Sequence, residues 1–554
     1  LMAGCVTVPA LARGTWTLQG DEYSVDTLYH ATVGPGTTET ELRIEATIDG
    51  SQVVNNIFYT VIDLANPYVE MRVAKAGNHM RKLETVPEIA NRMNQPGERY
   101  FAGVNADFFN MGEPYNPIGM CFANGFLTNY ATDGADIDPY YLVIDIEGVP
   151  TLARHVDNDW EGTMTFPTGS KYSFHLNAHR AEDEILLYTP QWQFYDWWGD
   201  KMHDVGYTGT NPYGVEVKVR PLGQNVLFGN NLQLEVIEDP QVGVGNMAIP
   251  SDGYVISAHG EACQYISALK KGDVVIANVG FSADEKSTSA KELVGGFPII
   301  LSNSRVQTIP SYPEHLSAPE PRSAVGYNED KSKLVMLVVD GRNAGGSSGV
   351  TQKQLAVIMR YVGCSEAMNF DGGGSSTMYV DGFGVKNVPS SSSLDKRPEG
   401  TPRTVVNALF AVATAPVDNE IASIELRDKS LSLTAGESFT PIVYGYNQYG
   451  VLVSTDLHGC TFDIPEVIAS VNGSTITAGD GQYCGLLTAD YNGLTYTIPV
   501  SINGGGDFIT SSVTDAIVED DISDDYYFLN GIKASFPIPG QITVTRDGKK
   551  TLTK

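Results

Sequence analysis

The sequence has little cysteine and little positive charge. Its 6 cysteines in 554 residues include no CxxC pair, which argues against a zinc site and against a disulfide framework. Cys460 and Cys484 fall in one predicted small domain, where they either form a disulfide or remain two buried thiols. Lysine and arginine total 36 against 66 acidic residues, so the formal net charge is −30. Such a surface repels nucleic acid and anionic membranes, and a phosphorylated substrate then needs a local cluster of arginines.

Long apolar runs are also lacking beyond the first residues, so no transmembrane segment is expected. Residues 1–12 read LMAGCVTVPALA and resemble the end of a secretory signal with an A-x-A cleavage site. The alternative is a lipoprotein signal, in which Cys5 carries the lipid. Both interpretations predict a secreted or cell-surface protein, in the periplasm or outside the cell.

Length and composition indicate a folded protein with more than one domain. Hydrophobic residues make up 42% of the chain and charged residues 18%, and 554 residues are too many for one ordinary core. We expect the α+β class, with a β-rich catalytic domain that contains a strand-helix-strand unit, then a small Ig-like β-sandwich and a short C-terminal module. The predicted boundaries are 13–416 for the catalytic domain, 419–503 for the Ig-like domain, 504–525 for an acidic linker and 526–554 for the tail.

The strand-helix-strand unit is expected in the second half of the catalytic domain. Lys333–Asp340 is a continuous apolar run rich in valine, which is typical of a buried strand. A helix is predicted over 351–363, where apolar residues recur at helical spacing. Two parallel strands joined through a helix place their carboxyl ends side by side, so Asp340 and Asp371 should share the rim where ligands of such sheets bind.

A glycine-rich turn follows the second of these strands. It consists of Asp371, Gly372, Gly373, Gly374, Ser375 and Ser376. Glycine tolerates positive φ and lets the backbone approach a ligand closely, so the turn can direct several N–H groups at one anion. The polar, serine-rich segment 387–400 either covers this site or is a solvent-exposed connector.

Two helix starts carry the pattern of a capping box. Thr351 and Gln354 open the helix of the strand-helix-strand unit, and Thr85 and Glu88 open a short helix that ends before residue 95. Each pair can satisfy backbone N–H groups that the first helical turn leaves without partners.

The first part of the catalytic domain is expected to consist of strands. Residues 22–75 alternate apolar and polar side chains, which is typical of an antiparallel sheet. A further strand, 100–104, leads to Asn105 and Asp107. From spacing alone, these two residues are either part of a site or an Asx turn at the strand end.

Eight motifs follow one another through the catalytic region. They are AGVNADFFN (102–110), LNAHR (176–180), LYTP (187–190), GGFPIIL (295–301), PRSAVGY (321–327), VVDGR (338–342), NFDGGGSSTM (369–378) and PRTVVNALF (402–410). Together they make residues 20–416 similar to the phosphodiester glycosidase family. The resemblance implies hydrolysis of a sugar, such as α-linked N-acetylglucosamine, that is joined through its anomeric carbon to a phosphodiester. The expected substrate is then a phosphorylated glycan.

The resemblance also implies which residues form the site. Asn105 and Asp107 match positions of the family's active-site pocket, and Asn177 with Arg180 matches its N-x-x-R. A leaving phosphate needs cations and N–H donors. The groups expected to supply them are Arg322, Arg342, Arg403, the amides of Gly372, Gly373 and Gly374, and the hydroxyls of Ser375 and Ser376.

Hydrolysis at an anomeric carbon also needs a carboxylate, which acts as a nucleophile or as a base on water. We expect Asp371 in this role, then Asp107, then Asp340. Each has a structural alternative: Asp371 holds the glycine turn, Asp107 caps a strand end, and Asp340 pairs with Arg342 or Arg322.

Two other functions fit the same residues. One is a metal-dependent phosphodiesterase that cleaves the P–O bond, which would leave a sugar phosphate and be stopped by a chelator. The other is a non-catalytic surface protein for glycan binding or adhesion. No cofactor is required for the glycosidase chemistry, although acids at one rim could bind a divalent cation.

The C-terminal region resembles bacterial proteins. The expected sandwich is similar to Ig-like modules of bacterial surface enzymes, and residues 526–554 are similar to tails of secreted Bacteroidetes proteins that act as sorting signals for a secretion machinery. The alternative for the tail is a terminal hairpin. Arg342 lies in a DGR motif where the animal member of the family has DGQ, which leaves the sugar and the aglycone open.

Overall fold

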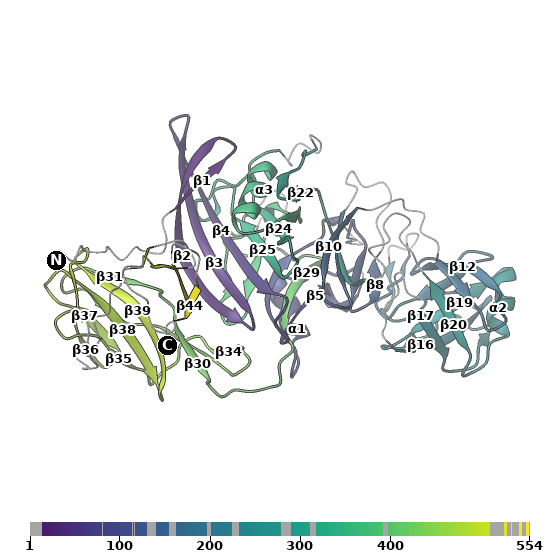
Figure 1. Cartoon of the computed structure of the whole chain (residues 1–554). Helices are drawn as coiled ribbons and strands as arrows, with labels where there is room; N and C mark the ends of the chain where they lie inside the picture. Colours follow the sequence, from purple (N-terminus) through teal and green to yellow (C-terminus); the bar gives the residue numbers. More distant parts are fainter. Residues whose placement is uncertain are drawn as a thin grey trace. The chain divides into compact units, whose positions relative to one another are not determined.

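The computed structural model describes residues 14–79, 81–112, 115, 117–129, 140–154, 162–196, 201–223, 232–278, 290–310, 317–391, 397–509 and four short strands between 526 and 552. The chain divides into two compact units (Figure 1). One consists of Leu11–Ser423 with Tyr444–Thr455, and the other includes Ile424–Val443 and Asp456–Lys554. The structure is rich in strands and has few helices, as the sequence predicts. None of the helices in the described part of the chain has the length and apolar character of a membrane span.

The largest sheet of the first unit has nine strands in the order β1-β2-β3-β4-β25-β24-β26-β22-β23. All of its pairings are antiparallel. Its first strands arise where apolar and polar residues alternate, because one face is buried. The strands are β1 (Gly14–Leu18), β2 (Asp21–Gly34), β3 (Thr37–Ile48), β4 (Ser51–Asp63), β22 (Ile299–Ser302), β23 (Arg305–Val306), β24 (Arg322–Tyr327), β25 (Lys333–Val339) and β26 (Glu366–Asn369).

The strand-helix-strand unit differs in one respect from the prediction. Helix α3 (Gln352–Tyr361) connects β25 to β26, but these strands are not neighbours, because β24 lies between them and is antiparallel to both. A short turn joins β24 and β25, so these two strands pair as a hairpin. β24 therefore takes the place next to β25 where β26 was expected. β25 and β26 still run in the same direction. Asp340 and Asp371 therefore end on the same side of the sheet.

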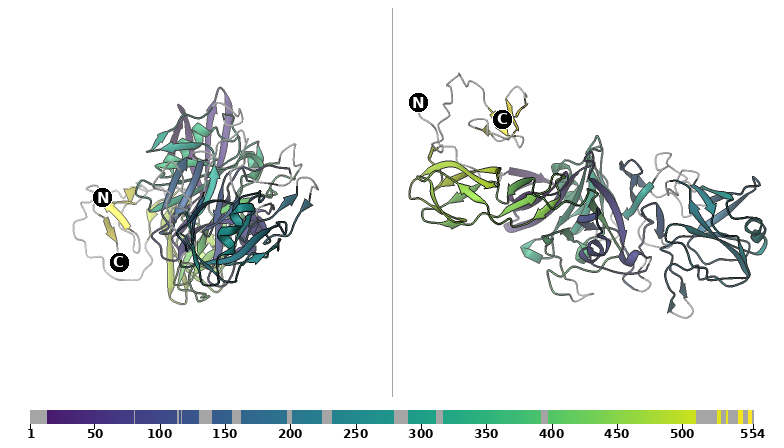
Figure 2. Two further views of the ribbon diagram at one scale, coloured as in Figure 1. Left: turned by 90° about the vertical axis from the view of Figure 1, so that its right-hand side faces the viewer. Right: turned by 90° about the horizontal axis from the view of Figure 1, so that it is seen from below.

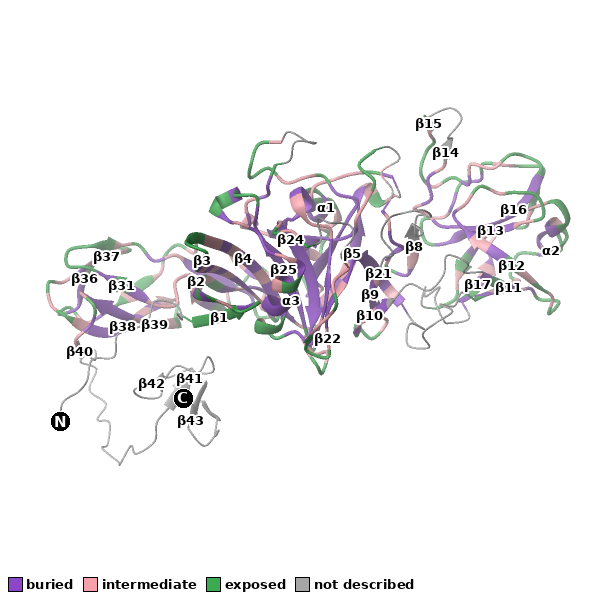
Figure 3. Cartoon of the chain, turned by 90° about the horizontal axis from the view of Figure 1, so that it is seen from above, coloured by how far each residue is buried: buried purple, intermediate pink, exposed green. Residues whose placement is uncertain are grey.

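A five-stranded sheet packs face to face against the nine-stranded one. Phe58, Val338 and Met368 of the first sheet share a core with Val104 and Leu409 of the second. β24, β25 and β5 are almost entirely buried (Figure 3). The order is β28-β27-β6-β29-β5, with β5 (Val69–Lys75), β6 (Arg99–Asn105), β27 (Met378–Val380), β28 (Gly384–Val385) and β29 (Asn407–Ala413).

One helix covers the outer face of each sheet. α3 packs Leu355 and Ile358 against the nine-stranded sheet, and α1 (Val86–Met93) packs Ile89 against the five-stranded one. Both predicted capping boxes are confirmed: the side chains of Thr85 and Thr351 each accept from the backbone N–H three residues later, and the Glu or Gln there accepts in return. The result is a β-sandwich with a helix on either side.

Two further sheets belong to the first unit and can be followed in Figure 2. A five-stranded sheet has the order β10-β9-β21-β7-β8, and an eight-stranded sheet, built from residues 162–278, has the order β17-β20-β11-β12-β13-β19-β16-β18. They share one apolar core. Their strands are β7 (Cys121–Ala123), β8 (Phe126–Asn129), β9 (Tyr140–Asp145), β10 (Pro150–Arg154), β11 (Gly162–Thr165), β12 (Lys171–Leu176), β13 (Ile185–Tyr188), β16 (Gly214–Pro221), β17 (Leu232–Val236), β18 (Gln241–Val242), β19 (Tyr254–His259), β20 (Val274–Asn278) and β21 (Ala290–Gly296).

The strands of the second unit include β31 (Leu431–Leu433), β32 (Ser438–Phe439), β35 (Thr461–Asp463), β36 (Ala469–Asn472), β37 (Thr475–Ala478), β38 (Tyr483–Tyr491), β39 (Leu494–Ile502) and β40 (Asp507–Phe508). Its identity as an Ig-like sandwich stays a prediction. Cys460 and Cys484 are two thiols with no disulfide between them, and Cys460 Sγ donates to the Leu457 carbonyl at 3.3 Å.

Both ends of the chain reach beyond the described residues. Near the C-terminus, β41 (Tyr526–Phe528), β42 (Lys533–Ala534), β43 (Ile542–Thr545) and β44 (Lys550–Leu552) pair as one small sheet. The role of this tail as a sorting signal stays a prediction. Residues 1–12 with Cys5, and most of the predicted acidic linker, lie outside the described residues.

Candidate functional site

The predicted catalytic acids come together where the two packed sheets end on one side. There β25 and β26 of the nine-stranded sheet end and β24 begins. In the five-stranded sheet β5 and β6 end and β29 begins, so Asn407 pairs with Lys75 and Ala408 with Asn105. The Asp371 N–H donates to the Ala106 carbonyl at 2.9 Å and joins the two sheets. We call this region the rim; it comprises residues 75, 105–107, 320–323, 340–342, 371–376 and 403–407.

Asn105 links the two sheets at the rim. Its Nδ2 donates to the Asp371 carbonyl at 2.7 Å, and its Oδ1 accepts from Ser323 Oγ at 2.7 Å and from the Thr377 N–H at 3.1 Å. The side chain is fully buried. Asn105 therefore fixes the backbone around Asp371.

Asp371 opens the glycine turn and is a partly exposed residue. Burial raises the pKa of this carboxyl to about 6, while the Ser375 hydroxyl, Arg403, the Gly372 N–H and Arg342 oppose the shift. The acid is thus mostly ionised at neutral pH and lies close to two cations.

The glycine turn receives guanidinium groups on two of its residues. A Cβ on Gly373 would lie 3.0 Å from Arg342 Nη2, and a Cβ on Gly374 would lie 2.5 Å from Arg403 Nη2 and 3.1 Å from Arg397 Nη2. Only glycine leaves room for these cations. Arg342 and Arg403 thus both lie against the triglycine turn.

Arg342 is held in an unusual backbone conformation. Its φ is 58°, in the left-handed region that side-chain-bearing residues rarely adopt. Its Nε donates to Glu320 Oε2 at 2.6 Å. Sequence reasoning missed Glu320, which precedes the PRSAVGY motif by one residue.

Two other arginines donate hydrogen bonds to backbone carbonyls around the turn. Arg322 is buried and donates to the carbonyls of Val350 at 3.1 Å and Ala318 at 2.7 Å, and burial lowers its pKa to about 10. Arg397 donates to the carbonyls of Gly374 at 3.1 Å and Ser390 at 3.3 Å. Sequence reasoning missed Arg397, although a cation in the polar segment 387–400 was the available signal.

Asp107 is enclosed beside Asp371. Its Oδ2 accepts from Asn407 Nδ2 at 2.6 Å, and a Cβ on Gly119 or Gly295 would lie only 2.6 or 2.2 Å from its Oδ1. Burial raises the pKa of Asp107 to about 7; hydrogen bonds from Asn407 and the Gly295 N–H and the charge of Lys75 oppose the shift, and the charge of Asp371 adds to it. The two acids are thus electrostatically coupled.

Lys75 was missed by sequence reasoning. It ends strand β5, its side chain is buried, and Nζ donates to the Val406 carbonyl at 2.9 Å. Burial lowers the pKa of Lys75 to about 8, while Cys121 and Asp107 act in the opposite direction. Because Lys75 lies near Asp107, its positive charge favours the ionised form of that acid.

Asp340 supports the far side of the turn. Its carboxylate accepts from Asn387 Nδ2 at 3.0 Å and from the Val388 N–H at 3.0 Å, and burial raises its pKa to about 7. Asn387 in turn donates to the Ser376 carbonyl at 3.0 Å. Arg342, one suggested partner of Asp340, is paired with Glu320 instead.

The two serines of the turn differ in their contacts. Ser375 Oγ accepts from Arg403 Nη1 at 3.2 Å and also bonds Asp371. Ser376 Oγ is buried and makes no hydrogen bond within the described part of the chain. Ser375 thus connects the cation to the acid.

Asn177 and Arg180 lie in the eight-stranded sheet region. Asn177 Nδ2 donates to Thr189 Oγ1 at 2.8 Å, and Arg180 donates to Ser257 Oγ and to the Asn211 carbonyl, each at 2.9 Å. These partners belong to the same region, and Arg180 also lies 4.0 Å from buried Glu216. The structure thus gives these two residues bonds inside that region, whereas the other predicted residues gather at the rim.

A divalent cation finds no ready ligand set. Across the described ranges, no three His, Cys, Asp or Glu side chains are placed to hold a metal ion together. At the rim, the acids are approached by guanidinium groups and amides.

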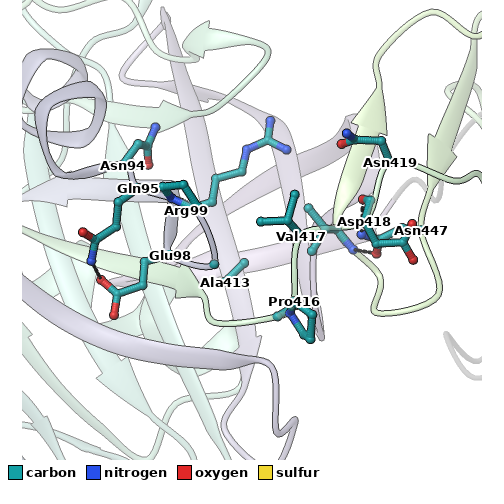
Figure 4. Close-up of a pocket in the computed structure, with 14 residues that line it drawn as sticks. Asn94, Gln95, Glu98, Arg99, Ala413, Pro416, Val417, Asp418, Asn419 and Asn447 are labelled. Atoms are coloured by element: carbon teal, nitrogen blue, oxygen red, sulfur yellow. Dashed lines mark hydrogen bonds between the residues drawn. The ribbon is translucent and has the colours of Figure 1, made fainter.

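A separate pocket lies away from these acids, between the end of α1 and the chain around 413–419 (Figure 4). Asn94, Arg99, Val417 and Asn447 are among its lining residues. Neither Asp371 nor the glycine turn lines it.

Two sequence comparisons are informative. Residues 230–412 match the family model described as phosphodiester glycosidase. The SPbeta prophage-derived uncharacterized protein YomE of Bacillus subtilis (strain 168) is 35% identical over 94 residues, which are 17% of this chain and 13% of that protein. This chain therefore spans only a small part of that relative.

Two solved structures resemble this chain at low sequence identity. A hypothetical protein from Synechocystis has a TM-score of 0.45 at 18% identity, over 73% of this chain and 68% of that chain. The zebrafish N-acetylglucosamine-1-phosphodiester alpha-N-acetylglucosaminidase catalytic domain, auto-inhibited by its pro-peptide, has a TM-score of 0.35 at 13% identity, over 70% of this chain and 87% of that chain.

The family match covers the second half of the motifs, including the glycine turn, Arg322, Arg342 and Arg403. Asn105 and Asp107 lie before it in the sequence and reach the same rim through the fold. Residues 230–412 thus match the phosphodiester glycosidase family that the motifs indicated.

Proposed function

We propose that this protein hydrolyses glycosyl phosphodiesters and releases a free sugar. The observation that carries the proposal is the convergence of Arg342 and Arg403 on Gly373 and Gly374, beside the carboxyl of Asp371. In a chain with a net charge of −30, such a local concentration of cations favours an anionic ligand.

The anion is assigned to the glycine turn. The phosphate of the substrate accepts from the guanidinium groups of Arg342 and Arg403 and from N–H groups of the turn. As the bond between the anomeric carbon and the phosphate oxygen breaks, negative charge develops on that oxygen. The same donors stabilise this charge, so the weakly basic leaving group departs with little help from a general acid.

Asp371 is assigned the attack on the sugar. Its pKa of about 6 leaves it ionised near neutral pH, as a nucleophile or as a base that takes a proton from the attacking water. Asp107, with a pKa of about 7, is the second carboxyl and can hold a proton in the same range. The products are the free sugar and a phosphomonoester.

Asp340, Arg322, Arg397 and Asn105 are assigned as positioning residues, since each bonds the backbone that carries the turn or the loops beside it. α-Linked N-acetylglucosamine remains the proposed sugar, and a phosphorylated glycan the proposed substrate. Secretion or display at the cell surface, the Ig-like module and the sorting role of the tail are part of the same proposal.

The test uses the methyl diester of N-acetylglucosamine α-1-phosphate. The wild type should release free sugar and methyl phosphate, and Asp371→Asn should lower kcat by about a thousandfold while the protein stays folded. Asp252→Asn, an exposed acid of the eight-stranded sheet region, is the control and should act like the wild type. Release of sugar phosphate, or more than about a tenth of the activity in Asp371→Asn, would contradict the proposal.

A further inference from the structure

Glu320 places a negative charge inside the cluster of arginines. Its carboxylate lies 2.6 Å from Arg342 Nε. Its charge also acts on Arg322. Burial lowers the pKa of Arg322, the charge of Glu320 opposes this shift, and the charge of Arg342 adds to it. Glu320 therefore lies within electrostatic reach of both guanidinium groups.

The backbone around Glu320 is arranged to bring it there. Glu320 exchanges both backbone hydrogen bonds with Val350, at 3.2 and 3.1 Å. A Cβ on Gly341 or Gly349 would lie 2.9 Å from backbone atoms of Glu320, so only glycine allows this approach. Together with the left-handed φ of Arg342, these contacts fix the position of the carboxylate.

Glu320 accepts a hydrogen bond from one edge of the Arg342 guanidinium and none from the other edge. The Nε edge donates to Glu320, whereas Nη1 and Nη2 lie 3.3 and 3.0 Å from a Cβ position on Gly373. Among the described residues, these two terminal nitrogens have no hydrogen-bond partner. The turn-facing edge is thus left for an anion, with a carboxylate held behind the cation.

We propose that Glu320 is a specificity-determining residue that favours a singly charged phosphodiester over the doubly charged phosphomonoester. The inference rests on the proposed function, since the diester is then the substrate and the monoester a product. A phosphomonoester carries close to two negative charges above its second pKa of about 6, whereas a diester carries one. Repulsion from Glu320 therefore weakens binding of the product more than binding of the substrate, and helps the product to leave.

The experiment compares direct binding of dimethyl phosphate and methyl phosphate to the full chain at about pH 8, by calorimetry. In Glu320→Gln, the affinity for methyl phosphate should rise about tenfold more than the affinity for dimethyl phosphate. Glutamine keeps an oxygen that can accept from Arg342, so a purely positioning role of Glu320 would leave the ratio of the two affinities unchanged. An unchanged ratio, or binding of neither ligand, overturns the inference.

The matched control is Glu329→Gln, which removes an exposed acid in the turn after the opposite end of β24 and should leave the ratio as in the wild type. A shift of equal size in Glu329→Gln would trace the effect to net charge and also overturn the inference. Turnover of the sugar diester is measured in the same samples. If the wild type does not turn over the sugar diester but the ratio of affinities shifts in Glu320→Gln, the result counts against the proposed function alone. If the wild type turns over the diester and the ratio does not shift, the result counts against the role of Glu320 alone.

Discussion

Arg403 at the rim and Arg180 in the eight-stranded sheet region look alike in packing and differ in what surrounds them. Both lie against a glycine, since a Cβ on Gly374 or on Gly214 would lie 2.5 Å or 2.3 Å from a terminal nitrogen of the respective arginine. Arg180 is 2% exposed and lies beside Glu216, which is 0% exposed. Arg403 instead lies near Arg342 and near Asp371, a partly exposed residue.

The comparison shows that close packing on a glycine does not by itself mark a functional arginine. Arg180 belongs to an enclosed ion pair with Glu216, and its terminal nitrogens donate to Ser257 and Asn211 of the same region, which is a structural arrangement. At the glycine turn, the guanidinium groups of Arg342, Arg397 and Arg403 lie around one partly exposed acid, Asp371. This local concentration of cations favours an anionic ligand.

The largest expected effect separates the two arginines directly. Arg403→Met should lower kcat/KM by about a thousandfold with little loss of stability, because it removes a donor to the developing phosphate charge. Arg180→Met should destabilise the protein by about 3 kcal/mol, because it leaves Glu216 buried without its cation, and should leave kcat/KM of the folded protein unchanged. Kinetics and urea unfolding of both variants check this. A loss of stability in Arg403→Met and a loss of activity in Arg180→Met would contradict these assignments.

A smaller loss is expected when the turn itself is changed. In Gly374→Ala the new Cβ would lie 2.5 Å from Arg403 Nη2, so the side chain of Arg403 must move away from the turn. We expect a decrease of about a hundredfold in kcat/KM and a change in melting temperature of only a few degrees. The control is Gly14→Ala in strand β1, where the nearest atom to the new Cβ is 4.0 Å away, and this variant should keep full activity. Wild-type activity in Gly374→Ala would show that Arg403 is not needed at the turn.

The acids of the rim should also give the stability a pH dependence. Burial raises the pKa of Asp107 to about 7, so between about pH 4 and pH 7 the folded state binds a proton that the unfolded state has lost. Stability therefore falls as pH rises through this window, and the Asp107 share of the fall is about 2 kcal/mol between about pH 5 and pH 7.

Urea unfolding of the wild type and of Asp107→Asn at both pH values isolates this share. Other buried acids with raised pKa, such as Asp340, act in the same direction, so the difference between the two proteins is the readout. Equal slopes in the two proteins would mean that Asp107 does not hold a proton in the folded state.

The smallest expected effect concerns the geometry of the cation at the turn. Arg342→Lys keeps the charge but loses the planar fork that reaches both Glu320 and the turn, so KM should rise about tenfold with little change in kcat. Arg220→Lys, which alters a pair with Asp252 on the surface of the eight-stranded sheet, is the matched control and should change neither constant. If Arg342→Lys and Arg220→Lys have the same KM, only the charge of Arg342 matters and the shape of its side chain does not.

Much of the local structure was predictable because it depends on near neighbours in the chain. The capping boxes at Thr85 and Thr351 and the buried strand before Asp340 follow from spacing and side-chain type. The insertion of β24 between β25 and β26 did not follow, since apolar runs do not specify which strand pairs with which. Lys75 and Glu320 were missed for the same reason: a charged residue at a strand end has no visible partner until the sheets are packed.

The sequence by itself determined which chemical groups this protein carries: the glycine turn after Asp371, the set of arginines and the ordered motifs, all of which are local patterns. The tertiary structure alone decided which of these groups meet, because their contacts join residues far apart in the chain. It placed Asp107 beside Asp371, put Arg342 and Arg403 on the turn, and gave Asn177 and Arg180 partners in the eight-stranded sheet region.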